Sequence, residues 1–421
     1  MNISSISSRV ASPDASDWLD EAEVAKLTPA MLVERAREIR DLAASFAQEA
    51  ERMRRPADAV ISAMRRAGIF YHFVPARYGG REFGLQTFID IVTTVAEGCA
   101  SSAWVMSFYM QHNLLLSQFP LQAQEEIFSK YPYVLAPVTT APPGKAVPVD
   151  GGYRLSGYWK YTSGVVHANW LMLAAFVERN NVPAEMRLFM LPVEQARVID
   201  KWYVDGLAAT GSQDVAVDNL IVPEHLSMEF EKIRSGVGHG KEMHQSHLFS
   251  LAVDVLLNVS SSSPAIGAAR ACVGHFRKRL LERSPIGADG KPDIRPSSMA
   301  RLAEATLAAE TAELLLREAA DRAEAAARAR QTLTAEQRLR IRSHIVYAVK
   351  HAKKAVQIVS DAAGTSAHSL DNPIQRAVRD VVMISSHTVY DWDIAMDLLG
   401  RVLTDTVSEN MLLHHSAGQV G

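Results

Sequence analysis

Several features that mark whole classes of protein are scarce or missing in this chain. Its 421 residues include only two cysteines, Cys99 and Cys272, which excludes a disulfide framework and a cysteine-rich metal site. The net charge of −3 shows no basic excess of the kind that binds nucleic acid. No apolar run approaches the ~18 residues of a membrane span, and the serine-rich residues 1–17 lack the apolar segment of a secretory signal. We therefore expect a soluble cytoplasmic protein with a loose leader at residues 1–17, and no nucleic-acid or membrane partner.

Nucleotide and metal signatures are missing as well. No Gly-x-Gly-x-x-Gly motif occurs, which argues against a built-in nicotinamide site of the Rossmann type. The run Gly236–Lys241 lacks the spacing of a Walker A motif, so it predicts a flexible loop between domains. Close by, His239, Glu242, His244 and His247 form the densest histidine cluster, but without an established ligand spacing. We expect no metal site there, and a loop at the mouth of a pocket instead.

Hydrophobic spacing divides the rest of the chain into three parts. Residues 18–132 show helical periodicity and predict an N-terminal helical domain. From 133 to 230 the period falls to two between turns rich in Gly, Pro, Asn and Asp, which predicts an antiparallel β-domain, a barrel or a sandwich. Residues 231–421 return to helical spacing, and short connections favour an antiparallel four-helix bundle. Its four helical segments are predicted over Leu248–Glu282, which is one long helix or a broken pair, Met299–Ala329, Thr334–Ala363 and Asn372–Arg401.

The stretch 151–175 predicts two strands joined by a polar turn. Tyr153, Trp159 and Tyr161 occupy positions of the same parity in the first strand, so their side chains should share one face. If the extended chain continues, Ser163 lies on that face too, just beyond the row of aromatic rings.

A predicted helix within the first domain carries two aromatic residues and a histidine at regular spacing. Trp104, Phe108 and His112 recur every four residues in an otherwise apolar segment. On its own, this pattern favours a core stripe with one satisfied histidine over a ligand site.

Charged groups and a histidine gather near the end of the chain. His387 falls within the last predicted helix, with Asp380 seven residues before it and Asp391 four after, so both carboxylates should lie near its face. This spacing fits a surface ion pair as well as an imidazole tuned by a carboxylate to work near neutral pH. Arg376 follows a helix start and could bind an anion, although a solvated basic face is the more frequent explanation.

The order of helices, β-domain and four long helices resembles the acyl-CoA dehydrogenase fold, which is mainly α with a central β-domain. Residues Tyr161-Thr-Ser163-Gly-Val-Val-His-Ala-Asn169-Trp170 are similar to that family's flavin-contact strand. Val138–Gly144 resembles its flavin and substrate loop, and Asn372–Asp380 resembles the approach to its catalytic helix. The resemblance implies that Ser163 bonds flavin N5 and that aromatic rings flank the flavin. The implied flavin contacts are Thr140, Trp159, Tyr161, Ser163 and Arg376.

One departure separates the chain from the dehydrogenases of this fold. Where they place a catalytic glutamate, the chain has Ile384-Ser-Ser-His387-Thr-Val, and removal of a thioester α-proton needs a carboxylate base. The histidine, the run Gly-Gly-Tyr-Arg-Leu-Ser-Gly before Trp159, and Ser-Ser-Ala-Trp…His112-Asn113 resemble the flavin-dependent monooxygenases of this fold. Those proteins are oxygenase components that take reduced flavin from a separate reductase, which agrees with the missing nicotinamide motif.

This second resemblance implies an aromatic hydroxylase. Reduced FMN or FAD would bind between the β-domain and the bundle, O2 would add at flavin C4a, and a small phenol- or indole-like substrate would be hydroxylated. Ser163 and His387 would protect and protonate the flavin peroxide, and His112 would accept the phenol proton. The family also implies a homotetramer. The implied walls of the substrate pocket are Trp104, Phe108, His112 and Trp392.

Other functions remain open from the sequence. They are an acyl-CoA dehydrogenase or oxidase with an atypical base, an N- or S-oxygenase of the same fold, and a non-enzymatic helical scaffold.

Overall fold

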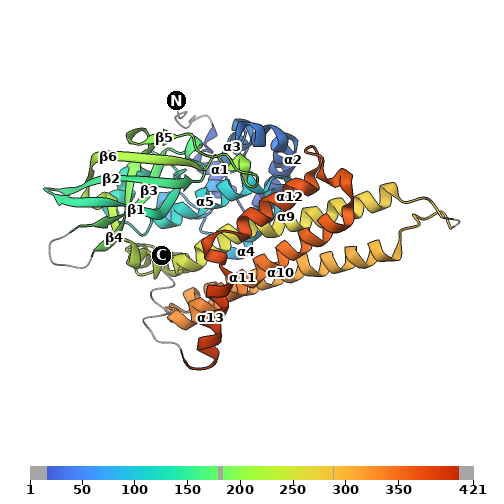
Figure 1. The fold of residues 1–421 in the computed structure, drawn as a ribbon. Helices are drawn as coiled ribbons and strands as arrows, with labels where there is room; N and C mark the ends of the chain where they lie inside the picture. Colours follow the sequence, from blue (N-terminus) through green and yellow to red (C-terminus); the bar gives the residue numbers. More distant parts are fainter. Residues whose placement is uncertain (1–16, 179–183, 288, 407–421) are drawn as a thin grey trace, which may run out of the picture.

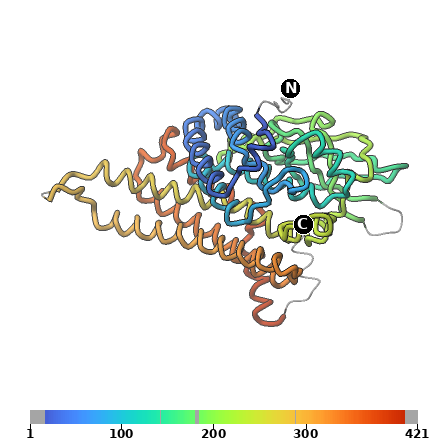
Figure 2. The backbone as a smooth tube through the Cα atoms, turned by 180° about the vertical axis from the view of Figure 1, so that it is seen from behind, coloured from blue at the N-terminus to red at the C-terminus, as the bar shows by residue number. Residues whose placement is uncertain are grey.

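The computed structural model describes residues 17–178, 184–287 and 289–406, so that of the predicted leader, residues 1–17, only Asp17 falls within it. The described chain forms helices, then a sheet, then long helices, and Figure 1 shows these three parts. In both views the N-terminal helices lie at the junction where the long helices meet the sheet (Figures 1 and 2). Within the described residues, no helix is both long and apolar enough to cross a membrane.

The first part of the chain is helical because apolar side chains recur along its segments and polar side chains cap them. The Thr28 side chain accepts a hydrogen bond from the Met31 N–H, and Pro29 occupies the first turn of α2. Helix α5 differs from the others because almost all of its residues are buried, polar ones included. It packs against α4 and the long helix α9, at the centre of the molecule. The helices are α1 (Glu21–Lys26), α2 (Pro29–Met53), α3 (Asp58–Arg66), α4 (Leu85–Gly98), α5 (Ala100–Leu116) and α6 (Leu121–Phe128).

A seven-stranded sheet follows, in the order β5-β6-β2-β1-β3-β4-β7. Neighbouring strands are antiparallel except for β1 and β3, which run parallel. The segment Val138–Gly144, expected as a loop, belongs to β1, but its register with β3 shifts between Thr139 and Gly144. Two prolines lie in that interval and have no N–H to donate to a ladder. The strands are β1 (Val138–Val149), β2 (Gly152–Thr162), β3 (Trp170–Val177), β4 (Glu185–Pro192), β5 (Arg197–Ile199), β6 (Gln213–Pro223) and β7 (Ser227–Glu229).

Long helices make up the last part of the chain and extend away from the sheet (Figure 1). Helix α9 contacts α10, α11 and α12 in addition to α4 and α5. Alanines line the buried face of α10 and allow its neighbours to approach closely. The helices are α7 (Phe230–Arg234), α8 (Gly240–Met243), α9 (Val253–Arg283), α10 (Pro296–Arg328), α11 (Ala335–Ala363), α12 (Pro373–Ser385) and α13 (Trp392–Leu403).

The last predicted helix, Asn372–Arg401, is wrong as a single element. Helix α12 ends at Ser385, a short 3-10 turn η10 (Thr388–Tyr390) follows, and α13 begins at Trp392. A new helix start forms here because the Asp391 side chain accepts a hydrogen bond from the Ile394 N–H and so caps α13.

Candidate functional site

Five of the predicted site residues lie together where α5 meets the break before η10. The rings of Trp104 and Phe108 are edge to face at 4.9 Å, and Phe108 stacks on His112 at 5.5 Å with 16° between their planes. The ring of His387 lies 6.2 Å from that of Trp104. Ser163 joins this group, because the Trp104 indole N–H donates to Ser163 Oγ at 3.1 Å. Residues from three parts of the sequence therefore form one cluster.

His112 is held in one tautomer by the backbone. Its Nδ1 lies 2.6 Å from the carbonyl oxygen of Ala136, and since a carbonyl only accepts, Nδ1 must carry the hydrogen. Burial lowers the pKa of His112 to about 3, so the ring is neutral at physiological pH. Its Nε2 is then a lone-pair acceptor that is buried and has no hydrogen-bond partner among the described residues. The expectation of a satisfied core histidine is wrong for this nitrogen.

His387 has a different environment from the one predicted. The proposed pairing with Asp380 or Asp391 is wrong, because α12 ends before His387 and the carboxylates bind elsewhere. Asp380 accepts from the Leu207 N–H at 2.6 Å, and Asp391 caps α13. Nδ1 of His387 accepts from the Val389 N–H at 3.3 Å, which leaves Nε2 to carry the hydrogen of the neutral ring.

No carboxylate raises the basicity of the His387 ring. Its pKa is lowered by burial within the protein, although the side chain keeps exposed surface. A neutral imidazole with a free N–H is a hydrogen-bond donor. His387 and His112 are therefore both neutral, and they present opposite hydrogen-bond polarity.

The predicted shared face of Trp159 and Tyr161 is wrong. The register of β2 with β6 shifts twice, and Tyr161 has a φ of 62°, which turns its side chain outward. Tyr161 is 65% exposed, whereas Trp159 is fully buried. The Trp159 N–H donates to the Ala174 carbonyl at 2.8 Å, and its ring fills space that a Cβ at Gly144 or Gly157 would occupy. Trp159 is thus a core residue with no exposed surface for a flavin, while the Tyr161 ring contacts only the edge of Trp202 among the described rings, and its flavin contact stays a prediction.

The remaining predicted residues lie apart from the cluster or at its edge. Thr140 is half-buried in the irregular part of β1, and its flavin contact stays a prediction. Arg376 is buried and pairs through Nε with Glu51 of α2 at 3.0 Å, so it is not a solvated cation; its flavin contact also stays a prediction. The described ring contacts of Trp392 are with Tyr347 and Lys350 of α11, not with Phe108 or Trp104.

Gln111 is a residue that the sequence reasoning missed. Both polar atoms of its amide are buried, and neither has a hydrogen-bond partner in the part of the chain that the structure describes. It follows Trp104 by seven residues and Phe108 by three, so it shares their face of α5. An unpaired buried amide costs roughly 1–3 kcal/mol, which makes it a candidate to bind a ligand. The only sequence signal was a polar residue in an apolar helix, and that is not specific.

Ser212 and Thr210 were also missed. Ser212 Oγ lies 2.9 Å from Ser163 Oγ, and Thr210 Oγ1 lies 2.6 Å from Ser212 Oγ. Thr-Gly-Ser before a strand is ordinary turn composition, so the sequence offered no reason to single it out.

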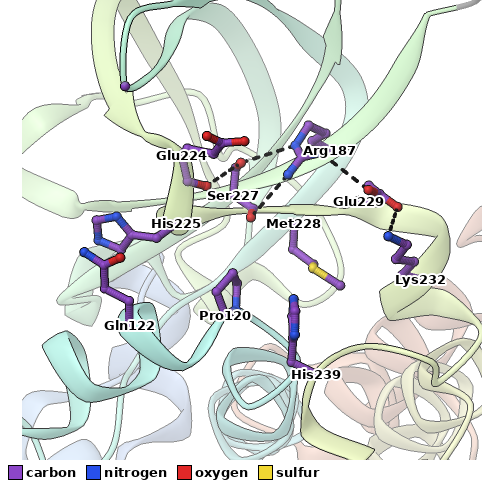
Figure 3. Close-up of a pocket in the computed structure, with 11 residues that line it drawn as sticks. Pro120, Gln122, Arg187, Glu224, His225, Ser227, Met228, Glu229, Lys232 and His239 are labelled. Atoms are coloured by element: carbon purple, nitrogen blue, oxygen red, sulfur yellow. Dashed lines mark hydrogen bonds and ion pairs between the residues drawn. The ribbon is translucent and has the colours of Figure 1, made fainter.

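A cavity of about 480 Å³ opens elsewhere, where β4 and β7 meet the start of α6 and the segment after α7 (Figure 3). None of the predicted catalytic or flavin-binding residues lines it. Arg187 is paired with Glu185, and Glu229 is paired with Lys232, whereas the Glu224 carboxylate and the His239 ring have no partner among the described residues. The cavity is therefore separate from the cluster around Trp104.

The histidine cluster of the sequence separates in space. His239 lines the cavity of Figure 3, His244 bonds Gln124 at 2.9 Å, and His247 bonds Glu324 at 2.9 Å. In the part of the chain that is described, no three His, Cys, Asp or Glu side chains are placed to hold a metal ion.

Known proteins match this architecture over most of the chain. The N-terminal domain of acyl-CoA dehydrogenases matches residues 29–131, and a C-terminal domain of that family matches residues 259–392, which confirms the predicted fold class. A pigment production hydroxylase of Rhodococcus sp. (strain ATCC 21145) is 32% identical and aligns with 92% of this chain and 100% of its own length.

Two further similarities connect the chain with flavin. The oxygenase component of a FADH2-dependent resorcinol hydroxylase of Rhizobium sp. (strain MTP-10005) is 32% identical, over 88% of this chain and 93% of that protein. The structure of XiaF from Streptomyces sp. in complex with FADH2 and glycerol is 28% identical, with a TM-score of 0.83, over 91% of this chain and 97% of that one. The chain therefore belongs to the reduced-flavin-dependent oxygenase components of two-component monooxygenases that share the acyl-CoA dehydrogenase fold.

Proposed function

We propose that this enzyme hydroxylates a small aromatic substrate with a phenol- or indole-type N–H or O–H group. It would use O2 and reduced FMN or FAD supplied by a separate reductase. The observation that carries the proposal is the free Nε2 of His112, a buried acceptor beside an aromatic ring. The relation to a resorcinol hydroxylase supports the same substrate class.

His112 would orient the substrate by accepting a hydrogen bond from it. A phenol O–H can donate to Nε2, while the hydrogen on Nδ1 stays with the Ala136 carbonyl. A phenol O–H that donates a hydrogen bond gains electron density on its oxygen. This density is shared with the aromatic ring and makes its carbon atoms more nucleophilic, which hydroxylation at carbon requires. Phe108 and Trp104 would contact the flat ring of the substrate.

The β2 strand and the turn after it fit a flavin. Ser163 keeps partly exposed surface and an unused lone pair, and the Tyr161 ring is available to pack on a flat cofactor. Thr140 and Arg376 are the further predicted contacts. Reduced flavin, when bound, supplies the electrons that activate O2. His387 would donate its Nε2 hydrogen to an oxygen atom that gains negative charge during the reaction.

In a direct test, purified protein is incubated with photochemically reduced FMN or FAD, O2 and a panel of phenols, indoles, amines and thioethers. We expect phenols or indoles to gain one oxygen atom by mass spectrometry, at a higher yield than flavin and O2 give without protein. Products only from amines or thioethers would refute hydroxylation at carbon. Reduction of flavin by an acyl-CoA would instead support the dehydrogenase alternative.

We also propose a homotetramer in the cytoplasm, as the family resemblance implied. Leu307 and Leu314 lie seven residues apart on α10 and are 64% and 69% exposed. A spacing of seven residues places both leucines on one face of the helix. Exposure of two apolar side chains to water on one face is unfavourable unless another subunit covers them. Light scattering after gel filtration measures the assembly.

A further inference from the structure

The hydroxyl of Ser163 belongs to a row of hydrogen bonds that ends on a backbone carbonyl. Trp104 Nε1 lies 3.1 Å from Ser163 Oγ, Ser163 Oγ lies 2.9 Å from Ser212 Oγ, and Ser212 Oγ lies 2.6 Å from Thr210 Oγ1. Thr210 Oγ1 then donates to the carbonyl of Leu207 at 2.9 Å. The row links α5, the end of β2 and the loop before β6.

The two ends of this row fix the direction of every hydrogen in it. An indole N–H can only donate, a carbonyl can only accept, and each hydroxyl has one hydrogen. Because Thr210 gives its hydrogen to Leu207, it must accept from Ser212. Ser212 must then accept from Ser163. The hydrogen of Ser163 is therefore directed to Ser212, and Ser163 meets any further group as an acceptor.

The loop that carries Thr210 and Ser212 is held in place by its backbone. Thr210 is fully buried and Ser212 is 2% exposed. The Thr210 carbonyl accepts from the Gly164 N–H at 3.0 Å, which ties this loop to the turn that follows Ser163. The Leu207 N–H donates to Asp380 at 2.6 Å. Reversal of the row would require these buried groups to give up partners.

The direction of the Ser163 hydrogen matters because flavin N5 changes its hydrogen-bond character with redox state. In reduced flavin N5 carries a hydrogen and donates, whereas in oxidised flavin N5 has a lone pair and accepts. An acceptor at Ser163 complements reduced flavin only. We propose, building on the flavin site of the proposed function, that Ser212 and Thr210 are positioning residues that keep Ser163 an acceptor and so make this site prefer reduced over oxidised flavin.

Three variants separate this role from a structural one. Ser212→Ala and Thr210→Val each remove an acceptor from the row and release the Ser163 hydrogen, which can then serve oxidised flavin. Thr210→Ser keeps the hydroxyl. Ser107→Ala is the matched control, because it removes a buried hydroxyl three residues after Trp104 that bonds only the Trp104 carbonyl.

The measurement is the Kd for oxidised flavin and, without oxygen, the Kd for reduced flavin. One hydrogen bond is worth about 0.5–1.5 kcal/mol, so the ratio of the oxidised to the reduced Kd should fall about 3- to 10-fold in Ser212→Ala and Thr210→Val. It should stay at the wild-type value in Thr210→Ser and Ser107→Ala. A tenfold fall corresponds to a midpoint potential of bound flavin about 30 mV more negative, which spectroelectrochemistry measures independently.

Two results would overturn the proposed direction. One is an unchanged ratio in both Ser212→Ala and Thr210→Val while flavin still binds. The other is the same fall in Thr210→Ser as in Thr210→Val, because the hydroxyl would then not be the cause. If the wild-type protein binds flavin in neither redox state, the proposed function itself fails, and this inference fails with it.

Discussion

Asp380 is a carboxylate whose ionisation should oppose folding. It is 2% exposed and accepts one hydrogen bond, from the Leu207 N–H. Burial is the main cause that raises the pKa of Asp380 from its ordinary 3.8 to about 7, and the charge of Glu51 raises it further. The hydrogen bond from Leu207 and the charges of Arg379 and Arg376 lower it, but less strongly.

The sign of the effect follows from proton linkage. The folded state holds the Asp380 proton more tightly than the unfolded state does, so this group destabilises the fold as pH rises above the unfolded value of 3.8. The two pKa values correspond to a cost of about 4 kcal/mol at pH 8 and about 1.5 kcal/mol at pH 5. Asparagine cannot ionise. The free energy of unfolding of Asp380→Asn, relative to wild type, should therefore rise by about 2–3 kcal/mol between pH 5 and pH 8.

Urea unfolding followed by tryptophan fluorescence at both pH values measures this difference. The asparagine keeps a carbonyl oxygen that can accept from Leu207, and any constant cost of the substitution cancels between the two pH values. Asp371→Asn, at an exposed position, controls for the loss of one negative charge. The same stability difference at pH 5 and pH 8 would show that Asp380 has no raised pKa in the folded protein.

Three further predictions concern the substrate and the assembly. His112→Leu should weaken phenol binding by about tenfold, the worth of one good hydrogen bond, and leave flavin binding intact; equal phenol affinity in calorimetry would contradict the proposed contact. Gln111→Leu should raise the melting temperature, because it removes an unpaired buried amide, and should change the Kd for substrate if that amide faces it; a lower melting temperature would refute the assignment. Leu307→Glu combined with Leu314→Glu should dissociate the tetramer in light scattering, whereas the exposed control Ile221→Glu should not.

The long helices were predictable because their periodicity extends over many turns. Thr334–Ala363 was expected and Ala335–Ala363 is observed, with Thr334 as the capping residue. The break around His387 was not predictable in the same way, because Ser385, Ser386 and His387 interrupt the pattern for less than one turn. The cap by Asp391 that restarts the helix is a local hydrogen bond, and its carboxylate had been assigned to His387 instead.

The prediction that Trp159 and Tyr161 share one face of β2 was wrong for a similarly local reason. Period-two reasoning assumes that every residue is extended, but Tyr161 has a φ of 62° in an interval where the register with β6 shifts, and this turns its own side chain away from the face of Trp159. Trp159 therefore belongs to the core and Tyr161 to the surface, although the sequence places them two residues apart. Nothing about a tyrosine in a strand signals positive φ.

In helix α5 the sequence shows the spacing of the side chains but not their hydrogen-bond partners. The spacing of Trp104, Phe108 and His112 was recognised, but on its own it favoured a core stripe, and two of these side chains are indeed buried. What distinguishes a site from a core is whether each polar atom has a partner. The partner of His112 Nδ1 is the Ala136 carbonyl, in a segment that no helical pattern connects with α5.

The two imidazoles near Ser163 differ in exposure but not in charge. The pKa of both rings is lowered, so neither His112, which is 2% exposed, nor His387, which keeps exposed surface, carries a positive charge at neutral pH. The backbone then gives them opposite polarity, since the Ala136 carbonyl leaves His112 an acceptor and the Val389 N–H leaves His387 a donor. In the proposed reaction, His112 would accept a hydrogen bond from the substrate, and His387 would donate one to the oxygen atom that gains negative charge. An ionised carboxylate at the position of His387, such as the dehydrogenases use, could only accept and so could not donate a hydrogen bond to that oxygen.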